Sequence, residues 1–301
     1  KEGEGGGERK PSQSARRRLK DEATEPSSKI STPPPKTSAA KRKPERRSSS
    51  KKTTSLPSSS LLLPSAVFPG FAPPTPEAVQ KAHDALADLH GLPQPPGALD
   101  ERQPVLDSLV RTILSQNTTD ATSARAFAAL KRAFPTWKAV LAAPPPAVHE
   151  AIHCGGLAEI KGERVARILQ WLLAHRSEHC AGGEPSMEYL RGFTDAEVKE
   201  ELSQFNGVGP KTVACVLMFA LDRHEFPVDT HVWRIARDRL KWVPPHATRE
   251  TTYAFLNASV PDRLKYTLHV LLVRHGKVCL RCSKKPSRDA VECPLRTAAA
   301  A

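Results

Sequence analysis

From about residue 75 onward, apolar residues recur at helical spacing in one short segment after another. The first segment, PEAVQKAHDALADLHG, has a proline near its start and a glycine at its end, as helices commonly do. Another, PVLDSLVRTILSQNTTD, places Val105, Leu109 and Ile113 on one face. About ten such segments are separated by short linkers with Pro, Gly or Asn, and no alternating strand pattern accompanies them. The pattern predicts a compact, all-helical domain.

Residues 1–70 have a different composition. They are rich in Ser, Pro, Lys and Arg and poor in aromatic residues. Such a segment buries too little apolar area to offset the entropy of ordering, so we expect a disordered tail, followed by a folded domain over residues 75–296. The run LLLPSAVFPGFA from Leu61 is too short and too rich in proline to span a membrane, and no membrane partner is expected.

The net charge of +13 is concentrated in this tail. Residues 1–70 contain 16 Lys and Arg against 7 Asp and Glu, whereas the remaining residues contain 29 against 25. The clusters KRKPERR and ARRRLK are typical of nuclear localisation signals, and a merely solubilising tail fits equally well. We expect the nucleus as the location, with an organellar leader left open because the sequence begins at Lys1. A scaffold that binds RNA or chromatin through the tail is a further alternative.

The stretch FNGVGPKTVACV joins two predicted helices by a Gly-x-Gly turn. It lacks the third glycine of a dinucleotide fingerprint and the glycine directly before Lys-Thr of a phosphate-binding loop. We expect Gly207 and Gly209 to adopt positive φ and to let the backbone approach a surface closely. The amides at the start of the next helix favour an anion, so the turn is suited to grip a phosphate. An ordinary turn between helices remains the alternative.

Lys211 and Asp229 each stand at the start of a predicted helix. Lys211 has apolar neighbours that disfavour its charged form, and a neutral amine can form a Schiff base with a carbonyl carbon. Asp229 lies eighteen residues on, within FPVDTHVWRIA. It is either a simple N-cap or a carboxylate that faces Lys211 and stabilises a developing cation.

Together, FNGVGPKTVACV and FPVDTHVWRIA resemble the helix-hairpin-helix/Gly-Pro-Asp superfamily of DNA glycosylases, over residues 104–275. Within it the chain is similar to endonuclease III and, through KWVPP, to the Demeter-type 5-methylcytosine glycosylases of plants. The resemblance implies an all-α fold with two lobes. A six-helix barrel would span 104–221, with the hairpin at 202–212, and residues 75–103 plus 222–296 would form the second lobe.

The resemblance also implies a mechanism in base excision repair. Lys211 would attack C1′ of the damaged nucleotide, the base would leave, and a Schiff base would lead to β-elimination and a strand nick. Asp229 would be the essential carboxylate. The chain would then be a bifunctional DNA N-glycosylase and AP lyase, acting as a monomer on double-stranded DNA with an extruded modified base. An oxidised pyrimidine is the expected target. The alternatives are a 5-methylcytosine glycosylase and an inactive DNA-binding module.

Looser matches give candidate DNA contacts. By resemblance, LVRTILSQNTTD supplies a polar side chain that fills the gap left by the flipped base, and CGGLAEIKGERVARIL supplies an apolar wedge with basic residues that meet phosphates. A polar helix end and an apolar loop anchor are the alternatives. The expected contacts are Gln116, Asn117, Leu157, Lys161 and Arg164, with Gly207, Gly209 and Thr212 from the hairpin.

The cysteines near the C-terminus depart from the family pattern. Relatives of endonuclease III usually end in an iron–sulfur loop of four cysteines, and a [4Fe–4S] cluster takes four thiolates. Here Cys279 and Cys293 match the first and third ligands, the second and fourth fall at Ala290 and Ala299, and Cys282 is extra. We therefore expect a degenerate loop that carries no metal. The alternatives are a [4Fe–4S] cluster completed by an outside ligand and another metal that is bound poorly. The lysine chemistry requires no cofactor.

Overall fold

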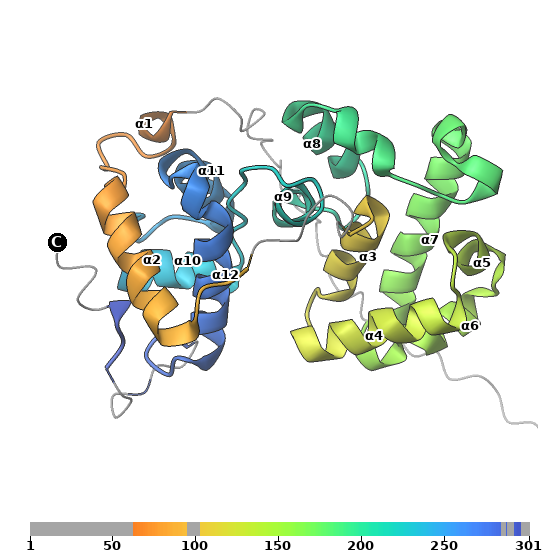
Figure 1. Cartoon of the computed structure of the whole chain (residues 1–301), viewed down its shortest axis with the longest axis horizontal. Coiled ribbons are helices and arrows are strands. Elements are labelled where there is room, and N and C mark those ends of the chain that lie inside the picture. Colours follow the sequence, from red (N-terminus) through yellow and green to blue (C-terminus); the bar gives the residue numbers. More distant parts are fainter. Residues whose placement is uncertain (1–62, 95–102, 284–286, 288–291, 296–301) are drawn as a thin grey trace, which may run out of the picture. The chain divides into compact units, whose positions relative to one another are not determined.

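The computed structural model describes residues 63–94, 103–283, 287 and 292–295 (Figure 1). Within these ranges the regular structure is helical and contains no strand, which confirms the all-α class. None of the helices in the described ranges combines the length and apolar character that a membrane crossing needs.

The helices are short and follow one another closely along the chain. The α-helices are α1 (Pro64–Val67), α2 (Pro76–His90), α3 (Val105–Leu114), α4 (Asp120–Ala133), α5 (Trp137–Ala142), α6 (Pro145–Ile152), α7 (Ala158–His175), α8 (Asp195–Ser203), α9 (Pro210–Phe219), α10 (Thr230–Arg234), α11 (Arg249–Ser259) and α12 (Asp262–Val278). Four 3₁₀ turns, η2 (His153–Gly155), η3 (Ser177–His179), η4 (Ala181–Gly183) and η5 (Glu188–Gly192), and a π-helical turn, η6 (Ile235–Arg239), complete the described set.

A threonine cap starts many of these helices. In α2, α4, α5, α8 and α11 the side chain of the residue before the helix accepts a hydrogen bond from the third backbone amide, and in each case that residue is threonine. A cap satisfies an amide that has no partner within the helix and adds about 1 kcal/mol of stability. The repeated caps explain why such short helices begin where they do.

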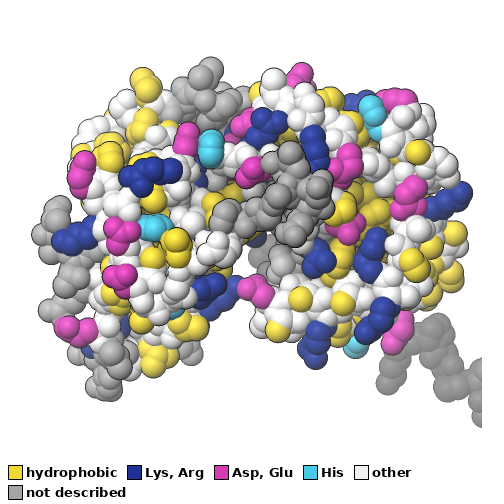
Figure 2. Space-filling view, viewed as in Figure 1, with side chains coloured by type: hydrophobic (Ala, Val, Ile, Leu, Met, Phe, Trp, Pro, Cys, Tyr) yellow, Lys and Arg dark blue, Asp and Glu magenta, His cyan; other side chains and the backbone are white. Residues whose placement is uncertain are grey.

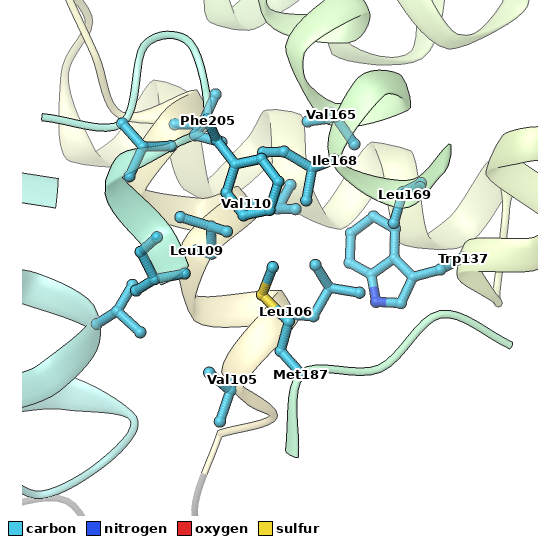
Figure 3. Close-up of a cluster of buried hydrophobic side chains, with 14 of the residues drawn as sticks. Val105, Leu106, Leu109, Val110, Trp137, Val165, Ile168, Leu169, Met187 and Phe205 are labelled. Carbon is cyan, nitrogen blue, oxygen red and sulfur yellow. The ribbon is translucent and has the colours of Figure 1, made fainter. Parts of the chain in front are cut away.

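The first hydrophobic core is built around α3, which packs on α4, α7 and α9. Figure 3 shows part of this core, where the labelled side chains are Val105, Leu106, Leu109, Val110, Trp137, Val165, Ile168, Leu169, Met187 and Phe205. Asp107 accepts a hydrogen bond from the indole nitrogen of Trp137 at 3.0 Å, so this buried aromatic residue has its polar atom satisfied.

The second core joins α2, α10, α11 and α12 to the last described residues of the chain. Helix α9 contributes to both cores, because Val213, Val216 and Leu217 belong to the first and Ala214 belongs to the second. In Figure 1, α9 lies between α3 and α8 on one side and α12 on the other. A group at the start of α9 is therefore anchored by two cores.

The structure corrects the prediction for residues 63–70. They form α1 and the turn after it, and Phe68 is 6% exposed, packed against Phe71 and Phe255. The expected disorder was wrong here because the apolar run that starts at Leu61 supplies two aromatic rings to the second core. Residues 1–62 lie outside the described residues.

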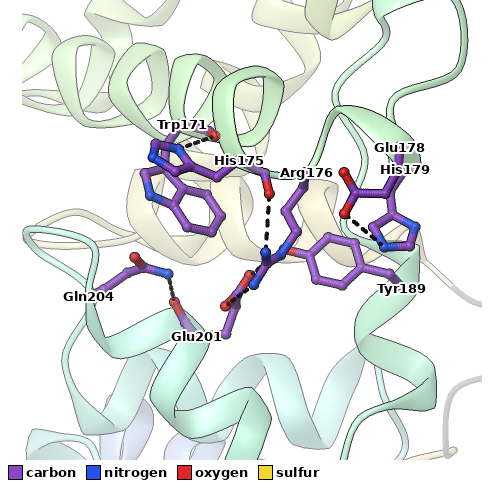
Figure 4. Close-up of polar contacts among 8 residues, drawn as sticks. All are labelled: Trp171, His175, Arg176, Glu178, His179, Tyr189, Glu201 and Gln204. Carbon is purple, nitrogen blue, oxygen red and sulfur yellow. Dashed lines mark hydrogen bonds and ion pairs between the residues drawn. The ribbon is translucent and has the colours of Figure 1, made fainter.

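A partly buried polar network holds α8 in place (Figure 4). The guanidinium of Arg176, just after α7, donates to both carboxylate oxygens of Glu201 at 3.0 and 2.9 Å, and the hydroxyl of Tyr189 donates to one of them at 2.7 Å. Burial and the Glu201 carboxylate raise the pKa of the Tyr189 hydroxyl, which therefore stays protonated and remains a donor. The network connects the end of α7 and η5 to the helix that leads into the Gly-x-Gly turn.

The surface carries both signs of charge. On the face shown in Figure 2, Lys and Arg side chains are interspersed with Asp and Glu side chains. This agrees with the nearly balanced 29 basic and 25 acidic residues after residue 70. The described residues on the face in view therefore show no single broad basic patch.

Candidate active site

The Gly-x-Gly turn between α8 and α9 has one position that only glycine fits. Gly207 has a φ of 85°, and a Cβ atom there would lie 2.5 Å from Nε of Arg164. The expectation of positive φ was wrong for Gly209, whose φ is −96° where it caps α9. A Cβ at Gly209 would meet nothing within 4 Å, so this position leaves open space beside the helix start.

Gln116 and Arg164 hold the backbone of the turn through hydrogen bonds. The amide nitrogen of Gln116 donates to the carbonyl oxygen of Gly207 at 2.9 Å, and Arg164 donates to the amide oxygen of Gln116 at 2.9 Å. The two side chains thus fix the backbone of the turn, in addition to any contact that they make with DNA. This bracing was not predicted from the sequence.

A cavity of about 520 Å³ brings most of the predicted site residues together. Its lining includes Gln116, Asn117, Gly207, Gly209, Lys211, Thr212 and Asp229. Thr212 contributes little exposed surface, being 4% exposed. Leu157, Lys161 and Arg164 lie outside the lining. The hairpin and the Asp motif, which are separated in the sequence, therefore share one cavity.

Asp229 occupies the cap of α10, as its sequence context predicted. One carboxylate oxygen, Oδ1, accepts a hydrogen bond from the backbone amide of Val232 at 2.8 Å. The residue also lines the cavity that contains Lys211. The cap uses Oδ1, so the second carboxylate oxygen is available for contacts within the cavity. Asp229 can therefore be both a helix cap and a carboxylate that faces Lys211.

The predicted loss of charge preference at Lys211 was wrong. Burial lowers the pKa of its ammonium, but the hydrogen-bonded Cys215 and the carboxylates of Asp229 and Asp120 raise it more, so the net pKa is raised. Burial in turn raises the pKa of the Cys215 thiol. In the free protein at neutral pH, Lys211 is an ammonium ion beside a neutral thiol, and it must lose a proton before it can act as a nucleophile.

His269, on α12, is a buried neighbour that the sequence did not reveal. Its Nδ1 is 2.8 Å from the carbonyl oxygen of Pro227, so Nδ1 carries the hydrogen and donates it. Burial, opposed by Asp229 and assisted by Lys211, lowers the pKa of this imidazole to about 4. His269 is therefore neutral at physiological pH, and it fixes the backbone two residues before Asp229.

A second cavity, of about 500 Å³, also borders Lys211. Lys211, Thr112 and Ser115 line both cavities. The second cavity has an aromatic wall, where Phe219 and Tyr266 meet edge to face with ring centroids 5.8 Å apart. Its lining also includes Ser108, Arg111, Ser115, Asp120 and Ser123. It therefore combines a surface for stacking with several polar groups.

Leu157 and Asn117 stand out by their backbone conformation. Both have left-handed φ values, 53° for Leu157 and 56° for Asn117. Asparagine tolerates this region, whereas for leucine it costs about 1–2 kcal/mol. Leu157 is also 51% exposed, and Ile160, on the next turn, is 50% exposed. A strained, exposed leucine ahead of α7 contributes little to the core, and this combination favours a role outside folding.

The structure corrects the assignment of Lys161 as a phosphate contact. Its side chain is buried, 2% exposed, and its ammonium donates to the carbonyl oxygens of Leu114 at 2.8 Å and Gly155 at 3.0 Å. Burial lowers the pKa of Lys161. Lys161 instead connects the end of α3, just before Asn117, to the loop just before Leu157. It is a positioning residue for these two loops.

The C-terminal cysteines converge with His275, which was not among the expected site residues. His275, Cys279, Cys282 and Cys293 each offer one ligand atom, and the four atoms lie within 4.8 Å of one another. This set does not fit a [4Fe–4S] cluster, which takes four thiolates, because it offers three thiolates and one imidazole. The positions of the missing family ligands, Ala290 and Ala299, lie outside the described residues.

Some of the omitted residues had a signal in the sequence and others had none. His275 precedes Cys279 and Cys282 in the spacing His-x3-Cys-x2-Cys, a pattern that indicates metal ligands. His269 and Tyr266 come from α12 and reach the site only through tertiary packing. Periodicity in the sequence marks them as helical but cannot indicate which cavity they approach.

Comparison with known sequences agrees with this geometry. The model of the HhH-GPD superfamily base excision DNA repair protein matches residues 110–262. The chain is 43% identical over 261 residues to the Arabidopsis thaliana "Putative DNA glycosylase", covering 76% of this chain and 87% of that protein. It is 34% identical over 178 residues to the Arabidopsis DNA glycosylase/AP lyase ROS1, covering 53% of this chain and 12% of that protein. Endonuclease III of Thermotoga maritima is 30% identical over 188 residues, covering 62% and 79%.

Solved structures support the fold. A non-covalent endonuclease III–DNA complex superposes with a TM-score of 0.59 at 20% identity, covering 73% of this chain and 93% of that one. A thermostable thymine-DNA glycosylase gives a TM-score of 0.52 at 15% identity, covering 70% and 88%.

Proposed function

This chain belongs to the HhH-GPD superfamily of base excision DNA repair proteins, and we propose that it is a bifunctional DNA glycosylase and AP lyase that removes a modified pyrimidine. Lys211 is the proposed nucleophile and Asp229 the proposed carboxylate. The observation that supports this most is that these two residues, from different helices, line one cavity together with the Gly-x-Gly turn. The Arabidopsis relative named DNA glycosylase/AP lyase supports the pairing of the two activities.

The local chemistry supports a Schiff base at Lys211. The residue is anchored at the start of α9, which belongs to both cores, so its amine is held in place. Asp229 has one oxygen beyond the cap and can take up the ammonium proton before the amine attacks C1′. The bond from C1′ to the base breaks as the bond to Nζ forms. The departing base takes a proton from Nζ. The C1′–O4′ bond then opens as O4′ takes the proton held by Asp229, which leaves a protonated Schiff base between Nζ and C1′. This Schiff base acidifies C2′, and loss of a C2′ proton expels the 3′ phosphate.

The two cavities lead to a proposed orientation for the flipped nucleotide. The turn at Gly207 and Gly209 is suited to hold a backbone phosphate, so the sugar faces Lys211 from the first cavity. The base then enters the second cavity, stacks on Phe219 and Tyr266, and meets polar groups that include Asp120. In this arrangement the second cavity selects the base and the first cavity performs the chemistry.

Leu157 and Asn117 are the proposed contacts on the duplex. Leu157 is exposed, apolar and strained, which suits a wedge that enters the base stack. Asn117 lines the first cavity. In this proposal its amide fills the space that the extruded nucleotide leaves. Lys161 holds the loops that carry both residues at a fixed separation.

A panel of duplexes tests the substrate. Each duplex carries one modified base, such as thymine glycol, 5-hydroxycytosine or 5-methylcytosine, and the products are resolved before and after alkali treatment. We expect excision of an oxidised pyrimidine with strand nicking that does not need alkali. A preference for 5-methylcytosine would change the proposed substrate but leave the proposed lysine mechanism unchanged. Products that appear only after alkali would contradict the lyase activity, and no excision of any modified pyrimidine would favour an inactive DNA-binding module.

A further inference from the structure

Four side chains of types that can bind metals meet at the end of α12, outside the lining of the cavity that contains Lys211 and Asp229. His275 lies in the last turn of α12, Cys279 is the residue that ends it, and Cys282 follows three residues later. Cys293 arrives from the last described segment. His275, Cys282 and Cys293 are buried, between 1% and 5% exposed, and Cys279 is partly buried.

We propose that His275, Cys279, Cys282 and Cys293 bind a single Zn²⁺ ion in tetrahedral coordination. Zinc lies about 2.3 Å from a thiolate sulfur and about 2.0 Å from an imidazole nitrogen, so neighbouring ligand atoms around it are separated by about 3.6 Å. Here the sulfur atoms of Cys282 and Cys293 are 3.6 Å apart, and Nε2 of His275 is 3.3 Å from the sulfur of Cys293. These two distances are close to the edges of such a tetrahedron, and all four ligand atoms lie within 4.8 Å of one another.

Nε2 is the ring nitrogen of His275 that can bind a metal ion. Nδ1 of His275 lies 3.0 Å from Nε2 of His90, on α2. A hydrogen on Nδ1, donated to His90, leaves the lone pair of Nε2 directed at the cysteines. Histidine ligands of metal ions commonly have such a partner on the second nitrogen, because it fixes the tautomer and the orientation of the ring.

Arginine side chains hold the loop that carries the ligands. Arg234 donates from Nε to the carbonyl oxygen of Cys282 at 2.7 Å, and Arg239 donates to the carbonyl oxygen of Arg281 at 3.0 Å. Three thiolates around a divalent ion leave one net negative charge, which these guanidinium groups offset. Built support of this kind is expected for a structural metal site with four protein ligands.

The site is connected to the proposed active site through α10. Arg234 belongs to α10, and the cap of the same helix is Asp229. Cys282, Cys293 and Leu295 pack in the second core with Val232 of α10. The metal would therefore stabilise the core that supports the carboxylate, without taking part in the chemistry.

Elemental analysis of the full-length protein, purified under reducing conditions without chelator, tests the proposal. We expect one zinc per chain and little iron. Exchange to Co²⁺ should give the visible bands of tetrahedral thiolate coordination. Cys282→Ser should lose these bands, Cys154→Ser, an exposed cysteine outside the site, should keep them, and His90→Phe should weaken metal affinity by roughly 10–100-fold.

Three results would overturn the proposal. The first is a protein without zinc whose cysteines all react with a thiol reagent. The second is a disulfide between Cys282 and Cys293 that persists in the folded protein after mild reduction. The third is iron near four atoms per chain. The cobalt spectrum of the parental protein keeps the test decisive even if Cys282→Ser fails to fold.

Discussion

Replacing Lys161 with methionine separates a buried cross-link from a phosphate contact. Methionine fills most of the same volume but removes the ammonium, so the carbonyl oxygens of Leu114 and Gly155 lose their donor. A buried acceptor without a partner costs about 1–3 kcal/mol, and relief of the buried charge offsets part of the sum for two acceptors. We expect Lys161→Met to lower the free energy of unfolding by about 2–4 kcal/mol.

Urea unfolding followed by tryptophan fluorescence measures this change, with an unaltered slope indicating the same surface exposed on unfolding. DNA binding at several salt concentrations provides the second readout. If Lys161 neutralised a phosphate, its loss would reduce the slope of log K against log[salt] by about 0.9. The cross-link predicts an unchanged slope. Lys81→Met, at an exposed position on α2, is the matched control and should change stability by less than about 0.5 kcal/mol.

An unchanged unfolding free energy together with a shallower salt dependence would refute this reasoning. It would show that Lys161 leaves its carbonyl partners to bind DNA. A lower free energy of unfolding together with an unchanged salt dependence would support Lys161 as the residue that sets the separation between Asn117 and Leu157.

Three further predictions concern the site and its surroundings. Asp229→Asn retains a helix cap but loses the negative charge, so we expect a melting temperature near the parental value. The excision rate in single-turnover assays should be lower by a factor of roughly 10²–10³. A parental excision rate would show that Asp229 is only a helix cap. Leu157→Gly relieves left-handed strain, so we expect a gain in unfolding free energy of up to about 1 kcal/mol with slower excision, and unchanged excision would contradict the wedge. The pKa of about 4 for His269 lies below the pKa of about 6.5 of a histidine in the unfolded chain, so the unfolded state binds a proton more readily than the folded state. The free energy of unfolding should therefore fall by about 3 kcal/mol as the pH drops from about 6.5 to about 4. His269→Gln should lessen this pH dependence, and an identical dependence would contradict the assignment to His269.

Local sequence patterns predicted the helices and the hairpin because their causes are local. The apolar periodicity, the threonine caps and the glycine at Gly207 all act within a few residues, and each could be recognised without tertiary contacts. The pairing of Lys211 with Asp229 required the family resemblance, since nothing local shows that α9 and α10 share a cavity.

Tertiary contacts decided the rest. Lys161 has the sequence context of a surface lysine, but two carbonyl oxygens from distant loops bury it. The pKa of Lys211 depends on Cys215, Asp229 and Asp120 together, so its apolar neighbours alone gave the wrong direction. Residues around Phe68 were predicted as disordered on composition, although two aromatic side chains sufficed to anchor them in the second core.

Borohydride trapping tests the central claim most directly. The protein is incubated with a duplex that contains its modified base, reduced with sodium borohydride, and digested, and the peptide bound to DNA is identified by mass spectrometry. We predict a covalent adduct on Lys211, no adduct with Lys211→Gln, and a parental yield with Lys81→Gln. Lys211→Gln should still bind DNA within a few-fold of the parental affinity, because phosphate contacts supply most of it. An adduct on another lysine, or a parental yield of adduct from Lys211→Gln, would contradict the account.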